Sequence, residues 1–443
     1  MATFNRDSSD EVSRGARAVV VRAETQGAER RDSDARLEEA KGLALAIGIE
    51  VCAAQAFRVR DRKPATLFGS GQVESIAALV EAEQAELVIV DNALSPVQQS
   101  NLEKATSAKV IDRTGLILEI FGERAATNEG RLQVELAHLD YQAGRLVRSW
   151  THLERQRGGF GFLGGPGETQ IEADRRMIRD RMAKIRRELD QVTRTRGLHR
   201  ARRQRAPWPV IALVGYTNAG KSTLFNRLTG ADVMAQDLLF ATLDPTMRQI
   251  ALPGLDKAIL SDTVGFVSDL PTQLIAAFRA TLEEVLSADL IVHVRDIAHP
   301  DTEAQREDVL DVLGELGVTG DGRGDGEAGD EPPPVIEAWN KLDLLDPETS
   351  ATMREVAERR DDVVILSALT GEGVDRLERA ISGRLTAGAS VHVLHVPSAE
   401  GAALAWLHEH GEVLSTRSEA DEMIVEVRLS DSALARFLKR NSG

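Results

Sequence analysis

The sequence has 443 residues, 42% of them apolar, which is enough for about three domains with packed cores. The single cysteine, Cys52, excludes an intramolecular disulfide and fits a reducing compartment, and no apolar run reaches the roughly 18 residues of a membrane-spanning helix. A net charge of −16 would disfavour nucleic acid if it were spread evenly, but residues 145–205 hold 17 Lys and Arg against 7 Asp and Glu. We therefore expect a cytoplasmic protein with a local cationic element, and leave peripheral attachment to a membrane open.

The first 125 residues have the pattern of a small α/β domain. Residues 1–15 are polar and expected to be disordered, whereas apolar, strand-like runs alternate with helical stretches over 16–125. Asp91-Asn92 follows one of these buried strands; such a pair can line a ligand cleft, but it more often forms a loop turn. The expected strands are 18–21, 51–59, 87–90 and 109–111, and the expected helices are 33–47, 73–85 and 96–106.

Apolar residues recur every seven positions over residues 126–206, on both sides of a glycine-rich interruption, which is typical of helices that pack along a seam. The stretch Thr169 to Glu172 has the T-x-x-E form of a capping box and predicts the start of the second helix. Two such helices joined by a short loop predict an antiparallel hairpin. The repeated positions are Leu132, Leu139, Leu146 and Leu153, then Ile171, Ile178, Ile185 and Val192.

The loop between the two helices, residues 157–167, contains six glycines. Glycines contribute no packing and lose much conformational freedom on folding, so a simple connector would hardly need so many. We interpret this tip as an RNA-binding element that includes Arg157, with Phe160 and Phe162 free to stack on unpaired bases. The alternative is a loose loop whose aromatic side chains fold back on the hairpin.

Arginines crowd the second helix of the hairpin. Such charge often marks only a solvated helix face. A run this one-sided in an acidic protein nevertheless favours contacts with phosphates. The predicted RNA-binding residues of this helix are Arg175, Arg176 and Arg179.

Residues 207–385 are expected to form a P-loop α/β domain. An apolar run at 210–214 leads into Gly215-Tyr216-Thr217-Asn218-Ala219-Gly220-Lys221-Ser222, which has the spacing G-x-x-x-x-G-K-[ST] and is followed by a helical pattern. The glycines let backbone N–H groups turn toward phosphate oxygens, and the N-terminus of the next helix adds a positive field. Lys221 is expected to reach the β- and γ-phosphates, and the Ser222 hydroxyl to bind Mg²⁺.

Two further segments predict a nucleotide switch. In the stretch 240–246 a threonine can complete the Mg²⁺ shell and sense the γ-phosphate, and we choose Thr242 over Thr246. The pattern D-x-x-G occurs at 262–265, where Asp262 would hold Mg²⁺ in its second shell or through water and the glycine N–H would contact the γ-phosphate. Loss of that phosphate would release both segments. The predicted catalytic residues are Lys221, Thr242 and Gly265.

Guanine selection is predicted by Asn340-Lys341-Leu342-Asp343, because guanine presents N1–H and N2–H₂ side by side and one carboxylate can accept from both. A backbone N–H of Ser367-Ala368-Leu369 would reach the guanine O6. Four patterns in this order, each after an expected strand, predict GTP as substrate and Mg²⁺ as cofactor. The predicted nucleotide site is Gly215, Tyr216, Thr217, Asn218, Ala219, Gly220, Lys221, Ser222, Thr223, Phe240, Ala241, Thr242, Leu243, Asp244, Asp262, Thr263, Val264, Gly265, Asn340, Lys341, Leu342, Asp343, Ser367, Ala368 and Leu369.

In these motifs the chain resembles the P-loop GTPases, and more closely the HflX-type GTPases. The closer resemblance also covers Gly164-Gly165-Pro166-Gly167-Glu168-Thr169-Gln170 and Leu132-Gln133-Val134-Glu135-Leu136, upstream of the P-loop. It implies a factor, monomeric when free, that binds the large ribosomal subunit and places the Gly-rich tip near the peptidyl transferase centre. It also implies that the factor splits or rescues stalled ribosomes under stress.

Phe266 follows the D-x-x-G pattern, where a glutamine often orients the attacking water. Phenylalanine cannot do this, so we expect slow intrinsic GTP hydrolysis that ribosomes accelerate. A hydrophobic residue at this position can also simply pack the switch.

The remaining segments are less informative. Residues 317–334 are Gly-, Asp- and Glu-rich and are expected to be a disordered insertion. Residues 386–443 are expected to form a small α/β domain, which the resemblance implies is family-variable and contacts the ribosome. One alternative function is a regulatory GTPase acting on a protein partner such as a protease or a membrane complex. Use of ATP by the N-terminal domain is weaker, because no Walker-type loop precedes Gly215.

Overall fold

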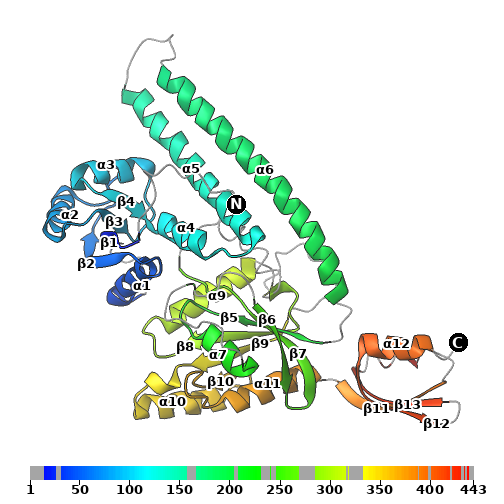
Figure 1. Cartoon of the computed structure of the whole chain (residues 1–443). Helices are drawn as coiled ribbons and strands as arrows, with labels where there is room; N and C mark the ends of the chain where they lie inside the picture. Colours follow the sequence, from blue (N-terminus) through cyan, green and yellow to red (C-terminus); the bar gives the residue numbers. More distant parts are fainter. Residues whose placement is uncertain are drawn as a thin grey trace.

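The computed structural model describes residues 14–25, 31–156, 166–203, 208–230, 240, 246–268, 285–315, 318, 333–387, 389–397, 401–419, 422–430, 434 and 437–438. Within this part of the chain, three separate β-sheets are accompanied by a long helical hairpin (Figure 1). The expected α/β class, with a helical hairpin between the first and second sheets, is confirmed.

The N-terminal sheet is entirely parallel and has the strand order β2-β1-β3-β4. Strand β3 is buried along its whole length, which is why its sequence is an unbroken apolar run. Helix α4 is largely buried as well, and Phe121 on it is fully covered. The elements are β1 (Arg17–Thr25), α1 (Ser33–Leu45), β2 (Glu50–Val59), α2 (Ser70–Glu83), β3 (Leu87–Val90), α3 (Pro96–Thr106), β4 (Lys109–Asp112) and α4 (Arg113–Arg124).

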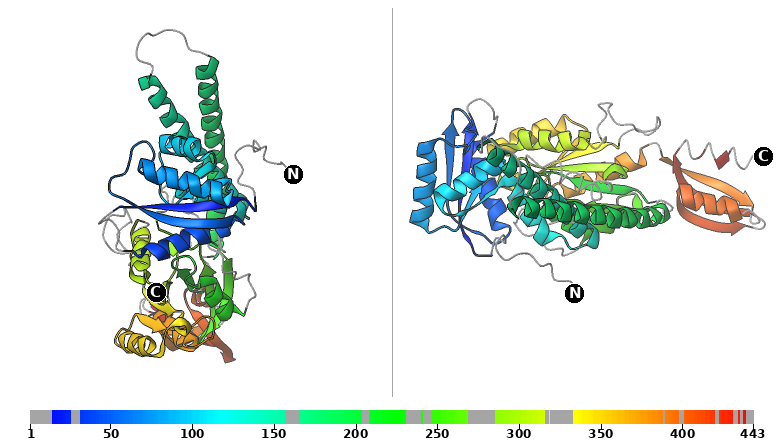
Figure 2. Two further views of the ribbon diagram at one scale, coloured as in Figure 1. Left: turned by 90° about the vertical axis from the view of Figure 1, so that its left-hand side faces the viewer. Right: turned by 90° about the horizontal axis from the view of Figure 1, so that it is seen from above.

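The hairpin consists of α5 (Asn128–Gln156) and α6 (Pro166–Arg203), which lie side by side and project away from the sheets (Figures 1 and 2). Leu132, Met182 and Ile185 are buried along the predicted seam. Helix α6 begins at Pro166 and not at the capping box that starts at Thr169, because proline is well suited to the first turn of a helix.

The central sheet has the order β10-β9-β8-β5-β7-β6, and all its strands are parallel except β6, which pairs antiparallel with β7. Its parallel strands therefore end at one common edge. The elements are β5 (Val210–Val214), α7 (Lys221–Thr229), β6 (Thr246–Leu252), β7 (Leu255–Asp262), β8 (Leu290–Asp296), α9 (Thr302–Glu315), β9 (Val335–Asn340), the 3₁₀ turn η1 (Leu342–Leu344), α10 (Pro347–Glu358), β10 (Val363–Ile365) and α11 (Val374–Thr386).

A single apolar core joins the N-terminal and central sheets. It contains Phe121 of α4 and Val134 of α5 together with Tyr216, Phe240 and Phe266 from the central domain. The rings of Phe121 and Phe240 meet edge to face, with their centroids 4.6 Å apart. The two domains are therefore packed against each other through buried side chains.

The C-terminal sheet is antiparallel, with the order β11-β13-β12, and α12 covers one of its faces (Figure 1). Trp406 on α12 packs against Phe437 in a small core of its own. None of the described helices is long and apolar enough to span a bilayer. The elements are β11 (Ala389–Pro397), α12 (Gly401–His410), β12 (Glu412–Glu419) and β13 (Glu422–Ser430).

Most of the segments expected to be disordered lie outside the described residues, as does the Gly-rich tip of the hairpin. Two residues near the ends of these segments are hydrogen-bonded to the folded domains. Gly15 donates its N–H to the carbonyl of Gly48 (2.8 Å), and Val318 is buried and donates its N–H to the carbonyl of Leu313 (2.9 Å).

Candidate guanine-nucleotide site

The loop between β5 and α7 requires its two motif glycines. Gly215 and Gly220 have φ angles of 151° and 94°, a region that side chains other than glycine rarely adopt. A Cβ on Gly215 would lie 2.2 Å from the carbonyl oxygen of Val294, and a Cβ on Gly220 would lie 2.2 Å from Nδ2 of Asn340. The loop can therefore pass this close to β8 and β9 only with glycine at both positions.

Lys221 is held inside this loop. Its Nζ donates to the carbonyl oxygens of Gly215 (3.0 Å) and Tyr216 (2.8 Å), and the residue is only 6% exposed. Burial lowers the pKa of Lys221 to about 8, although the nearby Asp262 carboxylate opposes this effect. A Cβ on Gly265 would lie 3.1 Å from this Nζ. The structure thus brings together the lysine and the D-x-x-G glycine, two of the predicted site residues.

Of the residues predicted to hold Mg²⁺, the structure describes Ser222 and Asp262, and it brings these two together. Ser222, at the start of α7, donates its hydroxyl to Oδ2 of Asp262, at the end of β7 (2.9 Å). A hydroxyl ligand from Ser222, with the Asp262 carboxylate beside it to bind the ion through water, would suit Mg²⁺, which prefers hard oxygen donors. Thr242 lies outside the described residues.

The predicted base-binding loops are joined by Asn340. Its Nδ2 donates to the carbonyl of Ala219 (2.8 Å), and its Oδ1 accepts from the N–H of Ala368 (2.8 Å). Asp343 accepts at Oδ1 from the Ser367 hydroxyl (2.5 Å). One side chain therefore fixes the P-loop against the last loop, and another orients the carboxylate predicted to select guanine.

The other predicted site residues are placed as follows. Phe240 is buried against Phe121, Thr263 is buried and donates its hydroxyl to the carbonyl of Leu213 (2.6 Å), and Leu369 is exposed. Lys341 pairs with Asp296 at the end of β8 (2.7 Å). The members of the predicted site that lie outside the described residues are Ala241, Thr242, Leu243 and Asp244.

Phe266 pairs the D-x-x-G segment with the P-loop. Its N–H donates to the carbonyl of Gly215 (3.1 Å), and its carbonyl accepts from the N–H of Thr217 (2.7 Å). The side chain is 2% exposed and belongs to the core shared with the N-terminal sheet. Of the two interpretations of Phe266, packing is what the structure shows, and no polar group of this side chain is available to orient water.

Several contacts near this site were not predicted from the sequence. Tyr216 was predicted only as part of the P-loop, yet its hydroxyl donates to Glu39 of α1 (2.7 Å) and accepts from the N–H of Ser268 (2.8 Å). Arg113 of α4 also reaches Ser268. No local sequence pattern could have identified these contacts, because Tyr216 and Glu39 are 177 positions apart.

The structure describes the predicted RNA-binding residues on α6 but not those at the tip of the hairpin. Arg176 and Arg179 are exposed on α6, and Arg175 is half-buried. The neighbouring Arg181 instead forms an ion pair with Glu135 of α5, with two nitrogen–oxygen distances of 2.5 and 2.8 Å. The tip residues Arg157, Phe160 and Phe162 lie outside the described residues.

The strand-end phosphate loop, the D-x-x-G segment beside it and the Asn-Lys-x-Asp loop define a P-loop GTPase, an enzyme that hydrolyses GTP to GDP and phosphate. Known families match most of the chain. The matches are to the GTP-binding GTPase N-terminal family over residues 34–122, the GTP-binding GTPase Middle Region over 124–203, the 50S ribosome-binding GTPase family over 210–319 and the HflX C-terminal domain over 352–443.

Whole-length relatives agree with these matches. The chain is 47% identical to the GTPase HflX of Magnetococcus marinus over 95% of this chain and 94% of the relative, and 44% identical to the GTPase HflX of Escherichia coli K12 over 82% of each. The chain belongs to the HflX family of GTPases. A solved GTP-binding protein from Sulfolobus solfataricus in complex with GDP is 22% identical, with a TM-score of 0.44 over 84% of this chain and 99% of that one.

Proposed function

We propose that this GTPase is a switched factor that binds the large ribosomal subunit and splits or rescues stalled ribosomes under stress. The observation that carries the proposal is a basic hairpin whose base shares one core with the nucleotide site. The match of residues 210–319 to a family described as 50S ribosome-binding GTPase supports the same partner. Ribosomal RNA offers the dense phosphate charge that a cationic hairpin on an acidic protein would bind.

We assign separate roles to the two ends of the hairpin. Arg176 and Arg179, exposed on α6, would contact phosphates along its length, with Arg175 beside them. Phe160 and Phe162, together with Arg157 at the tip, would approach unpaired bases closely. Arg181 is expected to contribute less to RNA binding, because it already forms an ion pair with Glu135.

The nucleotide site would control this binding. Lys221 and the N–H of Gly265 would hold the γ-phosphate, Ser222 and Thr242 would ligate Mg²⁺, and Asp262 would support the ion through water. Bound Mg²⁺ would neutralise charge on the phosphate oxygens. Since Phe266 supplies no group to orient water, we expect slow intrinsic hydrolysis that the ribosome accelerates by ordering the switch segments.

Sedimentation with purified large subunits tests the partner. The protein should sediment with them in the presence of a non-hydrolysable GTP analogue and remain in the supernatant with GDP. Arg176→Glu combined with Arg179→Glu should abolish co-sedimentation, because both substitutions place negative charge against RNA. Raising the salt concentration from 50 to 200 mM should weaken wild-type binding by about a thousandfold if six or more phosphates are contacted.

A matched control is available on the N-terminal sheet. Arg58, near the end of β2, and Arg60, directly after it, are both exposed. The double variant Arg58→Glu with Arg60→Glu therefore changes the net charge of the protein by the same amount as the hairpin variant, but outside the hairpin. This variant should bind like the wild type. Absence of wild-type binding at low salt would contradict the proposal and favour a GTPase that acts on a protein partner.

A further inference from the structure

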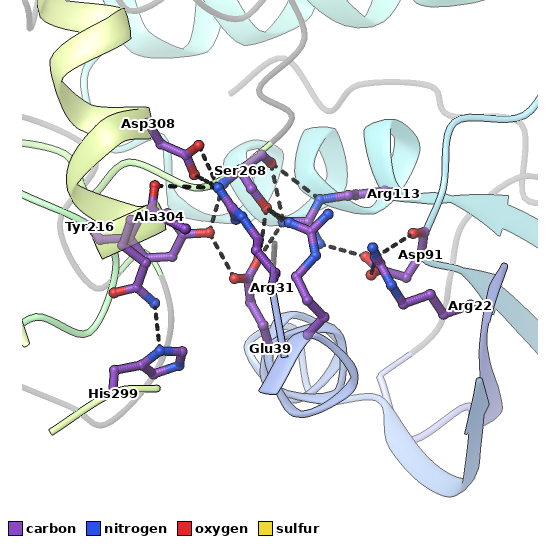
Figure 3. Close-up of polar contacts among 12 residues, drawn as sticks. Arg22, Arg31, Glu39, Asp91, Arg113, Tyr216, Ser268, His299, Ala304 and Asp308 are labelled. Carbon is purple, nitrogen blue, oxygen red and sulfur yellow. Dashed lines mark hydrogen bonds and ion pairs between the residues drawn. The ribbon is translucent and has the colours of Figure 1, made fainter. Parts of the chain in front are cut away.

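Ser268, three residues after the D-x-x-G glycine, has all its polar groups engaged by other elements (Figure 3). Its hydroxyl accepts from Arg36 (2.6 Å) and from Nη2 of Arg113 (2.9 Å), and its carbonyl accepts from Nη2 and Nε of Arg113 (3.2 and 3.3 Å). Its N–H donates to the hydroxyl of Tyr216 (2.8 Å). The N-terminal domain thus holds the end of the D-x-x-G segment directly.

Tyr216 brings the P-loop into the same network. Its hydroxyl donates to Glu39 (2.7 Å), and Glu39 also accepts from Arg113. Burial and the Glu39 carboxylate raise the pKa of Tyr216, so its phenol stays protonated and remains a donor at neutral pH. Both segments that contact the γ-phosphate in GTPases therefore meet at Arg113 and Glu39.

Asp112, the residue before Arg113, contacts the hairpin. Asp112 is buried and caps α4 by accepting the N–H of Gly115 (2.8 Å). It also accepts from the hydroxyl of Tyr141 (2.6 Å) and from Nη2 of Arg145 (2.8 Å), which both lie on α5. Two adjacent residues at the start of α4 therefore contact the switch on one side and the hairpin on the other.

Arg113 cannot easily move alone. Its Nη1 donates to Oδ1 of Asp91 (2.5 Å), and the other oxygen of Asp91 accepts from Arg22 (2.5 Å). Asp91 lies in the bend that follows β3, as expected of a loop residue, and its carboxylate also holds two buried arginines. A buried, fully paired guanidinium has few alternative positions, so a displacement of its partners is transmitted to the start of α4.

We propose that Arg113 is a positioning residue that couples the D-x-x-G segment to the hairpin. A shift of Ser268 that accompanies γ-phosphate binding moves Arg113 and the start of α4, and Asp112 passes this movement to Tyr141 and Arg145 on α5. The hairpin matters for ribosome binding only if the proposed function holds. The coupling itself is a property of the free protein and is tested without ribosomes.

The chain has two tyrosines, Tyr141 and Tyr216, and they lie at the two ends of this path. The full-length protein labelled with 3-fluorotyrosine should give two ¹⁹F resonances, assigned with Tyr141→Phe and Tyr216→Phe. When GDP is replaced by a non-hydrolysable GTP analogue, both resonances should shift in the wild type. In Arg113→Met the Tyr216 resonance should still shift, and the shift of the Tyr141 resonance should be lost.

Arg124 provides the matched control, since it lies in the last turn of α4 and donates only to the carbonyl of Ala46 (3.1 Å) among the contacts described. Arg124→Met should keep both shifts. Arg113→Lys keeps the positive charge but loses the planar guanidinium group that reaches Ser268, so the Tyr141 shift should be reduced at least twofold. This second variant keeps the test valid if Arg113→Met fails to fold. The coupling is overturned if the Tyr141 resonance of the wild type has the same position with GDP and with the GTP analogue. It is also overturned if Arg113→Lys shows the full wild-type shift of that resonance. Failure of ribosome binding alone would overturn only the proposed function.

Discussion

Lys221 keeps its charge in spite of its burial. Its Nζ has two carbonyl oxygens of its own loop as partners, Gly215 and Tyr216. Burial lowers the pKa of Lys221 to about 8, so the ammonium form still predominates at neutral pH. The lysine is thus held in position and charged, which is what recognition of the β- and γ-phosphates requires.

Asp343 is predicted to decide the choice of base. In Asp343→Asn the side chain loses its ability to accept from both guanine N1–H and N2–H₂, so GTP affinity should fall by about 100-fold, equivalent to about 3 kcal/mol. The amide should instead favour xanthosine triphosphate, whose base carries a carbonyl at that position. Fluorescence titration with both nucleotides measures the change.

The control for this variant lies three positions further on. Asp346 caps α10 and accepts from the N–H groups of Glu348 and Thr349 (both 3.0 Å), and asparagine caps helices equally well. Asp346→Asn should therefore leave GTP affinity unchanged. An equal loss in both variants, or none in Asp343→Asn, would show that Asp343 does not select guanine.

His293, buried in β8, should make the protein sensitive to acid. Burial lowers its pKa from 6.5 to about 3, so between these values the unfolded chain binds a proton that the folded chain does not. Stability should therefore fall as the pH falls through this window, by about 2 kcal/mol at pH 5. His293→Gln should show a smaller drop in Tm between pH 7 and 5, whereas substitution of the exposed His408 should leave the drop unchanged. Equal drops in all three proteins would contradict this origin.

At the scale of elements, α6 is long but sparsely supported. It has 38 residues, and Met182 and Ile185 are the buried side chains among those described on it. Helix α5, in contrast, also contributes Val134 to the core beneath it. The stability of α6 should therefore depend on a few contacts with α5.

Ile185, 0% exposed, is the residue to test. Ile185→Ala should destabilise the local fold by about 3 kcal/mol and accelerate hydrogen exchange of the α6 amides by on the order of 100-fold. Met177 is 63% exposed on the same helix, so Met177→Ala should change exchange only slightly. Similar effects of the two substitutions would mean that the hairpin seam does not stabilise α6.

At the scale of the whole molecule, the local motifs were predictable and the contacts between domains were not. The P-loop, the D-x-x-G segment and the Asn340 loop follow strands whose apolar runs are visible in the sequence, and the heptad spacing identified the hairpin. Asp91, by contrast, has the local pattern of a loop residue, and Arg113 and Ser268 are 155 positions apart. Side chains that meet only after two domains pack leave no periodic signal.

The whole molecule combines a GTPase domain with a basic hairpin. Because Phe266 is buried and offers no group to orient the attacking water, the free protein should hold GTP for a long time. Binding to the large subunit should order the switch segments and shorten that time. The nucleotide site would then limit how long the hairpin stays on the ribosome.

The most direct test is the rate of GTP hydrolysis by the full-length protein with and without isolated large ribosomal subunits. We expect slow turnover by the protein alone and acceleration by at least tenfold with the subunits, which corresponds to about 1.4 kcal/mol of the barrier. The double variant Arg176→Glu with Arg179→Glu should keep the slow basal rate and lose the acceleration. Fast turnover by the isolated protein, unchanged by large subunits, would contradict the proposed function.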